Sequence, residues 1–452
     1  MRTRVQWTAA MAMVGMLALA ACTDAVPQTP DGSAAPVPAA SAVADLDCGD
    51  GQELAKTLSS GATWSMCWSV DPAFGLVLSD VHIAPPGGKP ISVISSVTIS
   101  QLEVPYDTGD RLTSDITESG FGGTKMKTLE KESCIGDRLA ADIPDAGDGT
   151  YGKTRTREVL CSEVVDGGLA YHSSELVAPA VARTTDWQLS TVSRVGWYEY
   201  VTQYVFGADG SIGVRLGATG DLSPFDYADE DHGSAVGEGD HDHAASHSHN
   251  AVWRVHWALG GEKGMAVEQY DASPTGESGP QSPVVEGTIT PLPNPATAEW
   301  IDRRWWRVLA PGVLNGDGHP ISYQIDLERS DSFTFVEDHS HGEDAGYDVA
   351  FTNAQDCQLY ATRNAVLGCG DGVNDFVQRG SRESLDDVVS WVAIGFHHVP
   401  RDEDQSPMEM HWQGFTLLPR DLTAQRFDVP EGHEELNGVP GDEWLDKNGY
   451  GG

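Results

Sequence analysis

Two histidines separated by one residue, His247 and His249, stand directly before a segment with a strand pattern, AVWRVHWALG. Alternate residues of a β-strand face the same side of a sheet, so both imidazoles can reach one metal ion. Imidazole suits copper or zinc, but two such ligands do not complete a site. The pair His397 and His398, before Pro400 in GFHHVPRDEDQSPM, offers a third ligand. These residue types therefore indicate a transition-metal site.

The H-x-H motif ends a longer His-rich segment, DYADEDHGSAVGEGDHDHAASHSHN, over residues 226–250. This segment holds five histidines among seven acidic residues. Considered alone, it is typical of a solvated loop that scavenges metal ions. That interpretation stays open beside the specific site, and we expect His232, His241 and His243 to be solvated or to lie outside the direct ligands.

Composition and charge narrow the function classes. The 452 residues include 28 Lys and Arg against 68 Asp and Glu, which gives a formal net charge of −40 at pH 7. This balance argues against a nucleic-acid partner, because phosphate contacts are made mainly by clustered basic side chains. A hydrophobic fraction of 40% supports a substantial core and excludes general disorder. An acidic surface attracts cations, including metal ions and protonated amines.

The N-terminus predicts export and lipid attachment. Arg2 and Arg4 precede an apolar stretch that is too short to span a membrane and ends in Leu-Ala-Ala-Cys. This ending resembles the lipobox of bacterial lipoproteins, which implies a signal peptide over 1–21 and a lipid on Cys22. A simple cleavable signal with a chance cysteine is the alternative. Residues 22–46 have the Pro-, Ala- and Ser-rich composition of a flexible tether. We therefore expect an extracytoplasmic protein that touches the bacterial membrane only through its lipid.

The six cysteines that follow Cys22 predict disulfides, because their number is even and the chain carries an export signal. Six cysteines allow 15 pairings. No CxxC motif occurs among them, which argues against a thiolate metal site. Pairing neighbours along the chain is the simplest arrangement: Cys48 with Cys67, Cys134 with Cys161, and Cys357 with Cys369.

Strand patterns dominate the rest of the chain, and no long helical periodicity stands out. The predicted strands are rich in β-branched and aromatic residues and cover 75–83, 91–106, 157–165, 197–206, 211–219 and 251–260. Many strands separated by Gly, Asp and Pro turns indicate a large antiparallel β-sandwich. No repeat or second change of composition follows the tether, so we expect one mainly β domain over 47–452 with an acidic C-terminal tail.

One of these strand regions resembles a known family. Residues 195–220, VGWYEYVTQYVFGADGSIGVRLGATG, resemble the stretch of copper amine oxidases in which the tyrosine of Asn-Tyr-Asp/Glu-Tyr becomes topaquinone. The corresponding residue here is Tyr198. Residues 385–419 are similar to the family segment T-H-x-P-R-x-E-D-x-P-x-M. This similarity implies that His398 is the third copper ligand, together with the two histidines of the H-x-H motif.

Three shorter segments are similar to the same family, in the family's order. VPY puts Tyr106 on the tyrosine that contacts the quinone oxygen. SDITESGFG is similar to F-D-x-G-E-Y-G-x-G, which implies that Asp115 is the catalytic base and Glu118 the acid after it. CIGD falls where the family has a disulfide in this domain, which supports the pairing of Cys134 with Cys161.

The resemblance implies an enzyme with copper and topaquinone as cofactors. Such an enzyme oxidatively deaminates small primary amines with O2 and releases an aldehyde, ammonia and hydrogen peroxide. Asp115 then removes a proton from the substrate, and Tyr106 holds the cofactor that forms from Tyr198. The resemblance also implies a copper amine oxidase-type β-sandwich and a homodimer.

Several positions depart from the family pattern. Trp197 stands where the family has Asn before the cofactor-forming tyrosine, and Ser114 and Ser119 replace Phe and Tyr around the base. A chain that keeps the metal ligands but loses orienting residues is also compatible with a non-catalytic copper-binding or copper-buffering lipoprotein. A metal-free β-sandwich for adhesion or ligand binding is the third alternative.

Overall fold

The structure is a computed structural model. Two antiparallel sheets make up most of it. It describes residues 43–144, 152–174, 179–226, 231–236, 243–261, 263–301, 303–328, 346–362, 370–404, 406–433 and 441–447. The first sheet has the strand order β1 (Gln52–Thr57), β2 (Thr63–Asp71), β3 (Gly75–Ala84), β4 (Ile91–Pro105), β13 (His247–Trp257), β20 (Val388–His398), β19 (Val349–Asn353) and β16 (Ala296–Ala298). The short strand β5 (Leu112–Ser114) pairs with β4 beside this row.

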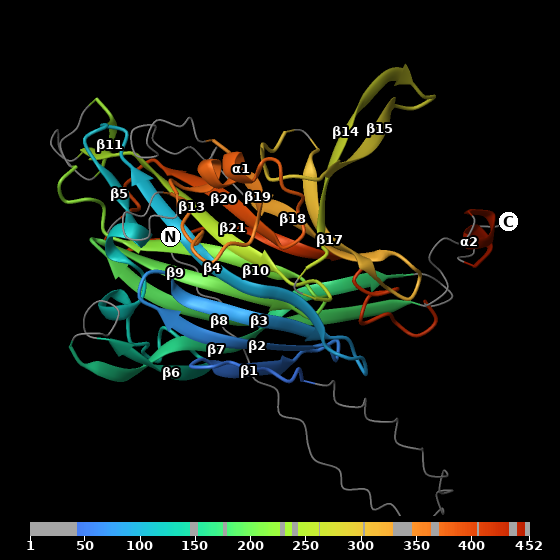
Figure 1. The fold of residues 1–452 in the computed structure, drawn as a ribbon, viewed down its shortest axis with the longest axis horizontal. Coiled ribbons are helices and arrows are strands. Elements are labelled where there is room, and N and C mark those ends of the chain that lie inside the picture. Colours follow the sequence, from blue (N-terminus) through green and yellow to red (C-terminus); the bar gives the residue numbers. More distant parts are fainter. Residues whose placement is uncertain are drawn as a thin grey trace, which may run out of the picture. The chain divides into compact units, whose positions relative to one another are not determined.

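The second sheet contains the remaining long strands (Figure 1). Its order is β15 (Pro283–Leu292), β14 (Ala266–Ser278), β17 (Trp305–Leu314), β18 (Pro320–Glu328), β21 (Met408–Arg420), β10 (Ile212–Gly220), β9 (Tyr198–Gly207), β8 (Ala180–Val195), β7 (Thr154–Ser173) and β6 (Asp137–Pro144). A separate pair joins β11 (Gly233–Ala235) to β12 (His243–Ala245). The helical elements are short: α1 (Val373–Gly380), α2 (Gly441–Lys447), a π-type turn at Asp115–Ser119 and a 3₁₀ turn at Gly123–Lys125. Within the described ranges, no helix has the length and apolar character to cross a bilayer.

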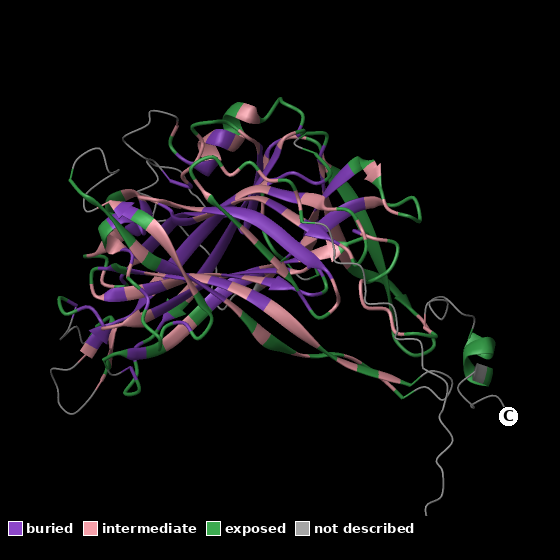
Figure 2. Cartoon of the chain, turned by 90° about the horizontal axis from the view of Figure 1, so that it is seen from below, coloured by how far each residue is buried: buried purple, intermediate pink, exposed green. Residues whose placement is uncertain are grey.

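Aromatic side chains join the two sheets. The ring of Trp64 on β2 lies 5.0 Å from that of Phe206 on β9, and its indole N–H donates to the Gly207 carbonyl. Trp253 on β13 meets Phe415 on β21 edge to face, with ring centroids 5.7 Å apart. Such pairs bury large apolar areas and add geometric preference to the packing. Figure 2 shows the buried residues concentrated on the central strands, so the core lies between the sheets.

The observed strands confirm the predicted mainly β fold. Four predicted strands begin and end within one residue of the observed β3, β4, β9 and β10. The segment predicted at 157–165 lies in the first part of the longer β7. The strand expected at 251–260 begins earlier, at His247, and ends at Trp257. The H-x-H motif is therefore part of β13 rather than a segment before it.

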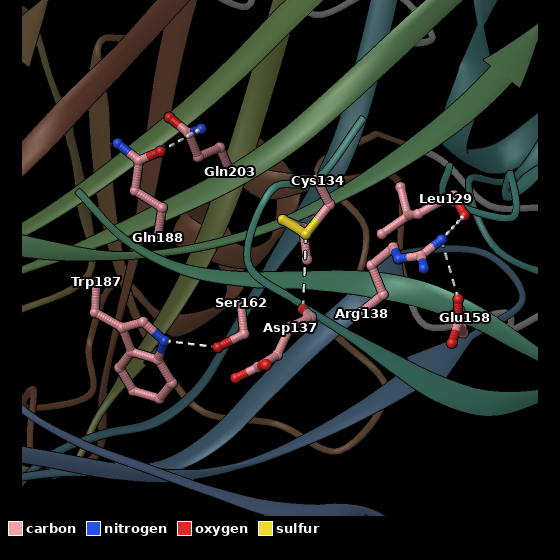
Figure 3. Close-up of a disulfide and its surroundings, with 10 residues drawn as sticks. Leu129, Cys134, Asp137, Arg138, Glu158, Ser162, Trp187, Gln188 and Gln203 are labelled. Carbon is pink, nitrogen blue, oxygen red and sulfur yellow. Dashed lines mark hydrogen bonds and ion pairs between the residues drawn. A yellow bond between two sulfur atoms is a disulfide. The ribbon is translucent and has the colours of Figure 1, made fainter. Parts of the chain in front are cut away.

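Two predicted disulfides are present, Cys48–Cys67 and Cys134–Cys161. Around the second, shown in Figure 3, Arg138 bonds the Leu129 carbonyl and pairs with Glu158. Cys357 is also disulfide-bonded, while Cys369 lies outside the described residues. The predicted signal peptide, Cys22 and most of the predicted tether lie outside them as well.

Candidate active site

Three buried histidines, His247, His249 and His398, form a cluster on two strands of the first sheet. These strands, β13 and β20, are neighbours (Figure 1). The antiparallel register pairs His247 with His398, and His249 follows two residues along β13 on the same face. The ring centroid of His247 lies 5.0 Å from that of His249 and 5.0 Å from that of His398. One ligand atom from each of the three lies within 4.8 Å of the others. Of the pair His397 and His398, only His398 joins the cluster. His397 is exposed, and its Nε2 lies 3.0 Å from Asp107 Oδ2.

The other histidines of the His-rich segment do not join this cluster. His243 begins β12, and the carbonyl of His232 accepts a hydrogen bond from the Ser246 N–H. Neither belongs to a group of potential metal ligands in the part of the chain that the structure describes. His241 lies outside that part.

Burial keeps the three clustered imidazoles neutral. It lowers the pKa of His247 to about 3, and it also lowers the pKa of His249 and His398 below the ordinary value. Neutral imidazole is the form whose lone pair binds a metal ion. Neither ring nitrogen of His249 has a hydrogen-bond partner among the described residues. Because an unpaired buried polar atom costs free energy, this donor set fits a bound metal ion.

Tyr198 reaches the histidine cluster from the opposite sheet. It is the first residue of β9, and its hydroxyl lies 2.8 Å from His247 Nε2 and 3.4 Å from His398 Nδ1. Its register partner on β10 is Gly220, with φ of +116°, where an added Cβ would lie 2.4 Å from the Trp197 carbonyl oxygen. A side chain at this position would force the start of β9 to move. Gly220 therefore allows the close approach that holds Tyr198 in place.

Asp404 is a site residue that sequence reasoning missed. Its carboxylate Oδ2 lies 2.9 Å from His398 Nε2 and also accepts the Arg401 N–H. A carboxylate only accepts hydrogen bonds, so Nε2 carries the proton and the lone pair of His398 is on Nδ1, the atom nearest Tyr198. The other carboxylate oxygen of Asp404, Oδ1, lies 3.7 Å from Nε2 of His411 on β21. The sequence signal was the E-D of the family segment T-H-x-P-R-x-E-D, which falls on Glu403 and Asp404.

A cavity of about 210 Å³ adjoins Tyr198. Asp115 lines it from the turn after β5, and Tyr106 lines it from the end of β4. Desolvation by burial raises the pKa of Asp115 to about 7, although hydrogen bonds from Thr113 and Tyr200 oppose this rise. The structure therefore brings together the tyrosine, the acid and the second tyrosine that the sequence singled out.

Trp197 contacts the site directly. Its indole N–H donates to the Tyr106 hydroxyl at 3.2 Å, and the Tyr106 ring stacks on His247 with centroids 4.6 Å apart. The Tyr106 hydroxyl also hydrogen-bonds the Ser223 side chain, so it has two partners at the cavity. Trp197 stands where the family has an asparagine, and its hydrogen bond to the Tyr106 hydroxyl orients that side chain.

Comparison with known proteins identifies the family. A sequence profile described as copper amine oxidase, enzyme domain, matches residues 57–432. The chain belongs to the copper amine oxidase family. Histamine oxidase from Arthrobacter globiformis is 28% identical over 387 residues, which cover 80% of this chain and 55% of that protein. Primary amine oxidase 2 from Arabidopsis thaliana is 24% identical over 415 residues, covering 84% of this chain and 59% of that one.

Solved copper amine oxidases share the fold. A copper-containing benzylamine oxidase from Hansenula polymorpha superimposes with a TM-score of 0.69 at 22% identity, covering 82% of this chain and 62% of that chain. The Aspergillus nidulans amine oxidase gives a TM-score of 0.66 at 19% identity, covering 81% and 52%. This chain therefore spans between about half and three-fifths of the length of the relatives it matches.

The cofactors of the copper amine oxidase family are copper and topaquinone, and the residues of this site fit both. The three neutral histidines with convergent nitrogens form a donor set that suits copper. A buried tyrosine with its hydroxyl inside that donor set is placed to yield a quinone.

Replacing Asp404 with alanine is expected to weaken copper binding by about 10–100-fold, because His398 loses the partner that holds its Nδ1 toward the cluster. Competition with a chelator, followed by metal analysis, measures the change. Asp402→Asn is the matched control, because Asp402 is an exposed acid in the same loop. Equal copper affinity in Asp404→Ala and the control would contradict this role.

Proposed function

We propose that this chain is a primary-amine oxidase that converts an amine RCH2NH2, O2 and water into an aldehyde, ammonia and hydrogen peroxide. One observation carries the proposal: the Tyr198 hydroxyl lies among three histidines while Tyr198 also lines a cavity that contains Asp115. Copper and a topaquinone formed from Tyr198 supply the two-electron oxidation that ordinary side chains do not perform well. The remaining tasks fall to side chains of the cavity.

Asp115 is the group best suited to move a proton in this cavity. Its carboxyl is buried, and a pKa of about 7 means that it gains and loses a proton near neutral pH. When ionised, its carboxylate takes a proton from the carbon that bears the substrate amine. The Tyr200 hydroxyl, which hydrogen-bonds this carboxyl, holds it in one orientation.

Other side chains position the reactants. Tyr106, fixed by its hydrogen bond from Trp197 and its stacking on His247, keeps the Tyr198 side of the cavity in place. Glu118 is exposed at the same cavity, and its negative charge attracts a protonated amine. Buried walls around Tyr198 keep bulk water from the reacting atoms.

The Tyr198 peptide of copper-loaded, air-exposed protein is expected to gain two oxygen atoms and lose two hydrogens, which peptide mass spectrometry detects. Phenylhydrazine should then label the intact protein at this residue. Copper-free protein and Tyr198→Phe serve as controls, and neither should react.

A fully copper-loaded protein with an unmodified Tyr198 would overturn the oxidase proposal. It would favour the alternative of a non-catalytic copper-binding lipoprotein on the same scaffold.

Activity is expected to fall as the pH drops through about 7, since protonation of Asp115 removes the base. Asp115→Asn should lower kcat by roughly 10²–10⁴-fold and abolish this acid limb. Peroxide release measured across pH tests both points, with the exposed Asp110→Asn as control. An acid limb that persists unchanged in residual Asp115→Asn activity would assign the titration to another group.

We further propose that the protein is exported, lipid-anchored through Cys22 and dimeric. The N-terminal sequence supports export, and the disulfides in the described region suit an oxidising compartment. Cells that express the full chain should incorporate labelled palmitate into it, and Cys22→Ser should lose the label. Labelling that survives this substitution would contradict attachment at Cys22.

A further inference from the structure

An arginine lines the cavity and is not one of the clustered metal ligands. The Arg111 guanidinium lies 5.3 Å from the ring centroid of Trp197 and 5.3 Å from that of Phe225. Its Nε donates to Asp226 Oδ2 at 2.7 Å. Asp226 is itself held by the Ser223 hydroxyl. Aromatic contacts and an ion pair thus hold this cation in one orientation.

The hydrogen-bonding fork of Arg111 is only partly used within the described part of the chain. Among the described residues, its only side-chain hydrogen bond is the one from Nε, and neither Nη atom has a partner. The side chain is 30% exposed, while the Asp226 side chain beside it is 7% exposed. Asp226 therefore fixes the guanidinium from one edge and leaves the two Nη groups open to a ligand.

The backbone places this cation and the proposed base at separate points of one wall. Every second residue from position 111 to position 115 lines the cavity: Arg111, Thr113 and Asp115. Thr113 is the middle residue of β5. Arg111 directly precedes β5 and Asp115 directly follows it, so the length of this strand separates the two side chains along the chain. The cavity wall consequently carries the Asp115 carboxyl and the Arg111 guanidinium at two different positions.

We propose that the cavity takes amines that carry a carboxylate at their far end, the class of ω-amino acids. The proposal rests on the oxidase function above. A guanidinium fork matches a carboxylate with two parallel N–H···O bonds. The same cation repels a second ammonium, so it disfavours diamines.

The test compares three substrates of equal chain length on the copper-loaded, air-oxidised full chain: 5-aminopentanoate, pentylamine and 1,5-diaminopentane. We expect kcat/KM to fall in that order, with 5-aminopentanoate favoured over pentylamine by about tenfold or more, as for other charged hydrogen-bonded pairs. In Arg111→Gln this ratio should fall to near one. Arg420→Gln is the matched control, because Arg420 also stacks on a tryptophan, Trp305, at 4.4 Å but does not line the cavity.

A second readout needs no turnover. Wild-type protein should form an adduct faster with 4-hydrazinylbenzoate, which carries a carboxylate, than with phenylhydrazine. Arg111→Lys keeps the positive charge but loses the guanidinium fork, so this rate ratio should fall in that variant. This variant decides the matter if Arg111→Gln fails to fold. Wild-type protein that oxidises pentylamine as well as 5-aminopentanoate overturns the specificity proposal alone. Protein that forms no adduct with either hydrazine and no peroxide from any amine overturns the oxidase function, and with it this proposal.

Discussion

The pairing of β13 with β20 is the constraint on which the site depends. Its register sets His247 opposite His398, while β13 alone sets His249 on the same face. A slip of one residue would turn each histidine of the moved strand to the other side of the sheet. Tyr198 can complete the cluster only because the second sheet packs over this face. The inter-sheet aromatic pairs therefore serve the metal centre as well as the core.

Placing such a site between two sheets brings polar groups into an apolar core. Burial makes the histidines neutral and raises the pKa of Asp115 to about 7, so the same desolvation prepares ligands and base. Hydrogen bonds then orient individual side chains, which burial alone does not do. Asp404 orients His398, and Trp197 orients Tyr106. The cost of an unpaired His249 in the apoprotein is offset when a metal ion binds.

Much of this was predictable because it depends on local patterns. Strand alternation located β3, β4, β9 and β10, and the i, i+2 rule placed two ligands on one face. The boundaries of β13 were less predictable, because polar residues at a strand start resemble a loop until the neighbouring strands are known. Arg111 was missed because charged residues in loops are usually solvated, and only its packed neighbours mark it as part of a site. Asp404 falls on the last acid of the family segment T-H-x-P-R-x-E-D, but only the folded chain shows that it contacts His398.

The sequence by itself determined the mainly β fold and the acidic character of the chain. It also supplied the set of histidines, tyrosines and Asp115 from which a site was expected. These follow from residue types and short-range spacing. Tertiary structure alone decided which strands are neighbours, which nitrogen of His398 faces Tyr198, and that Arg111 shares a cavity with Asp115. Those outcomes depend on contacts between residues up to about 200 positions apart, which packing of two sheets sets and local periodicity does not encode.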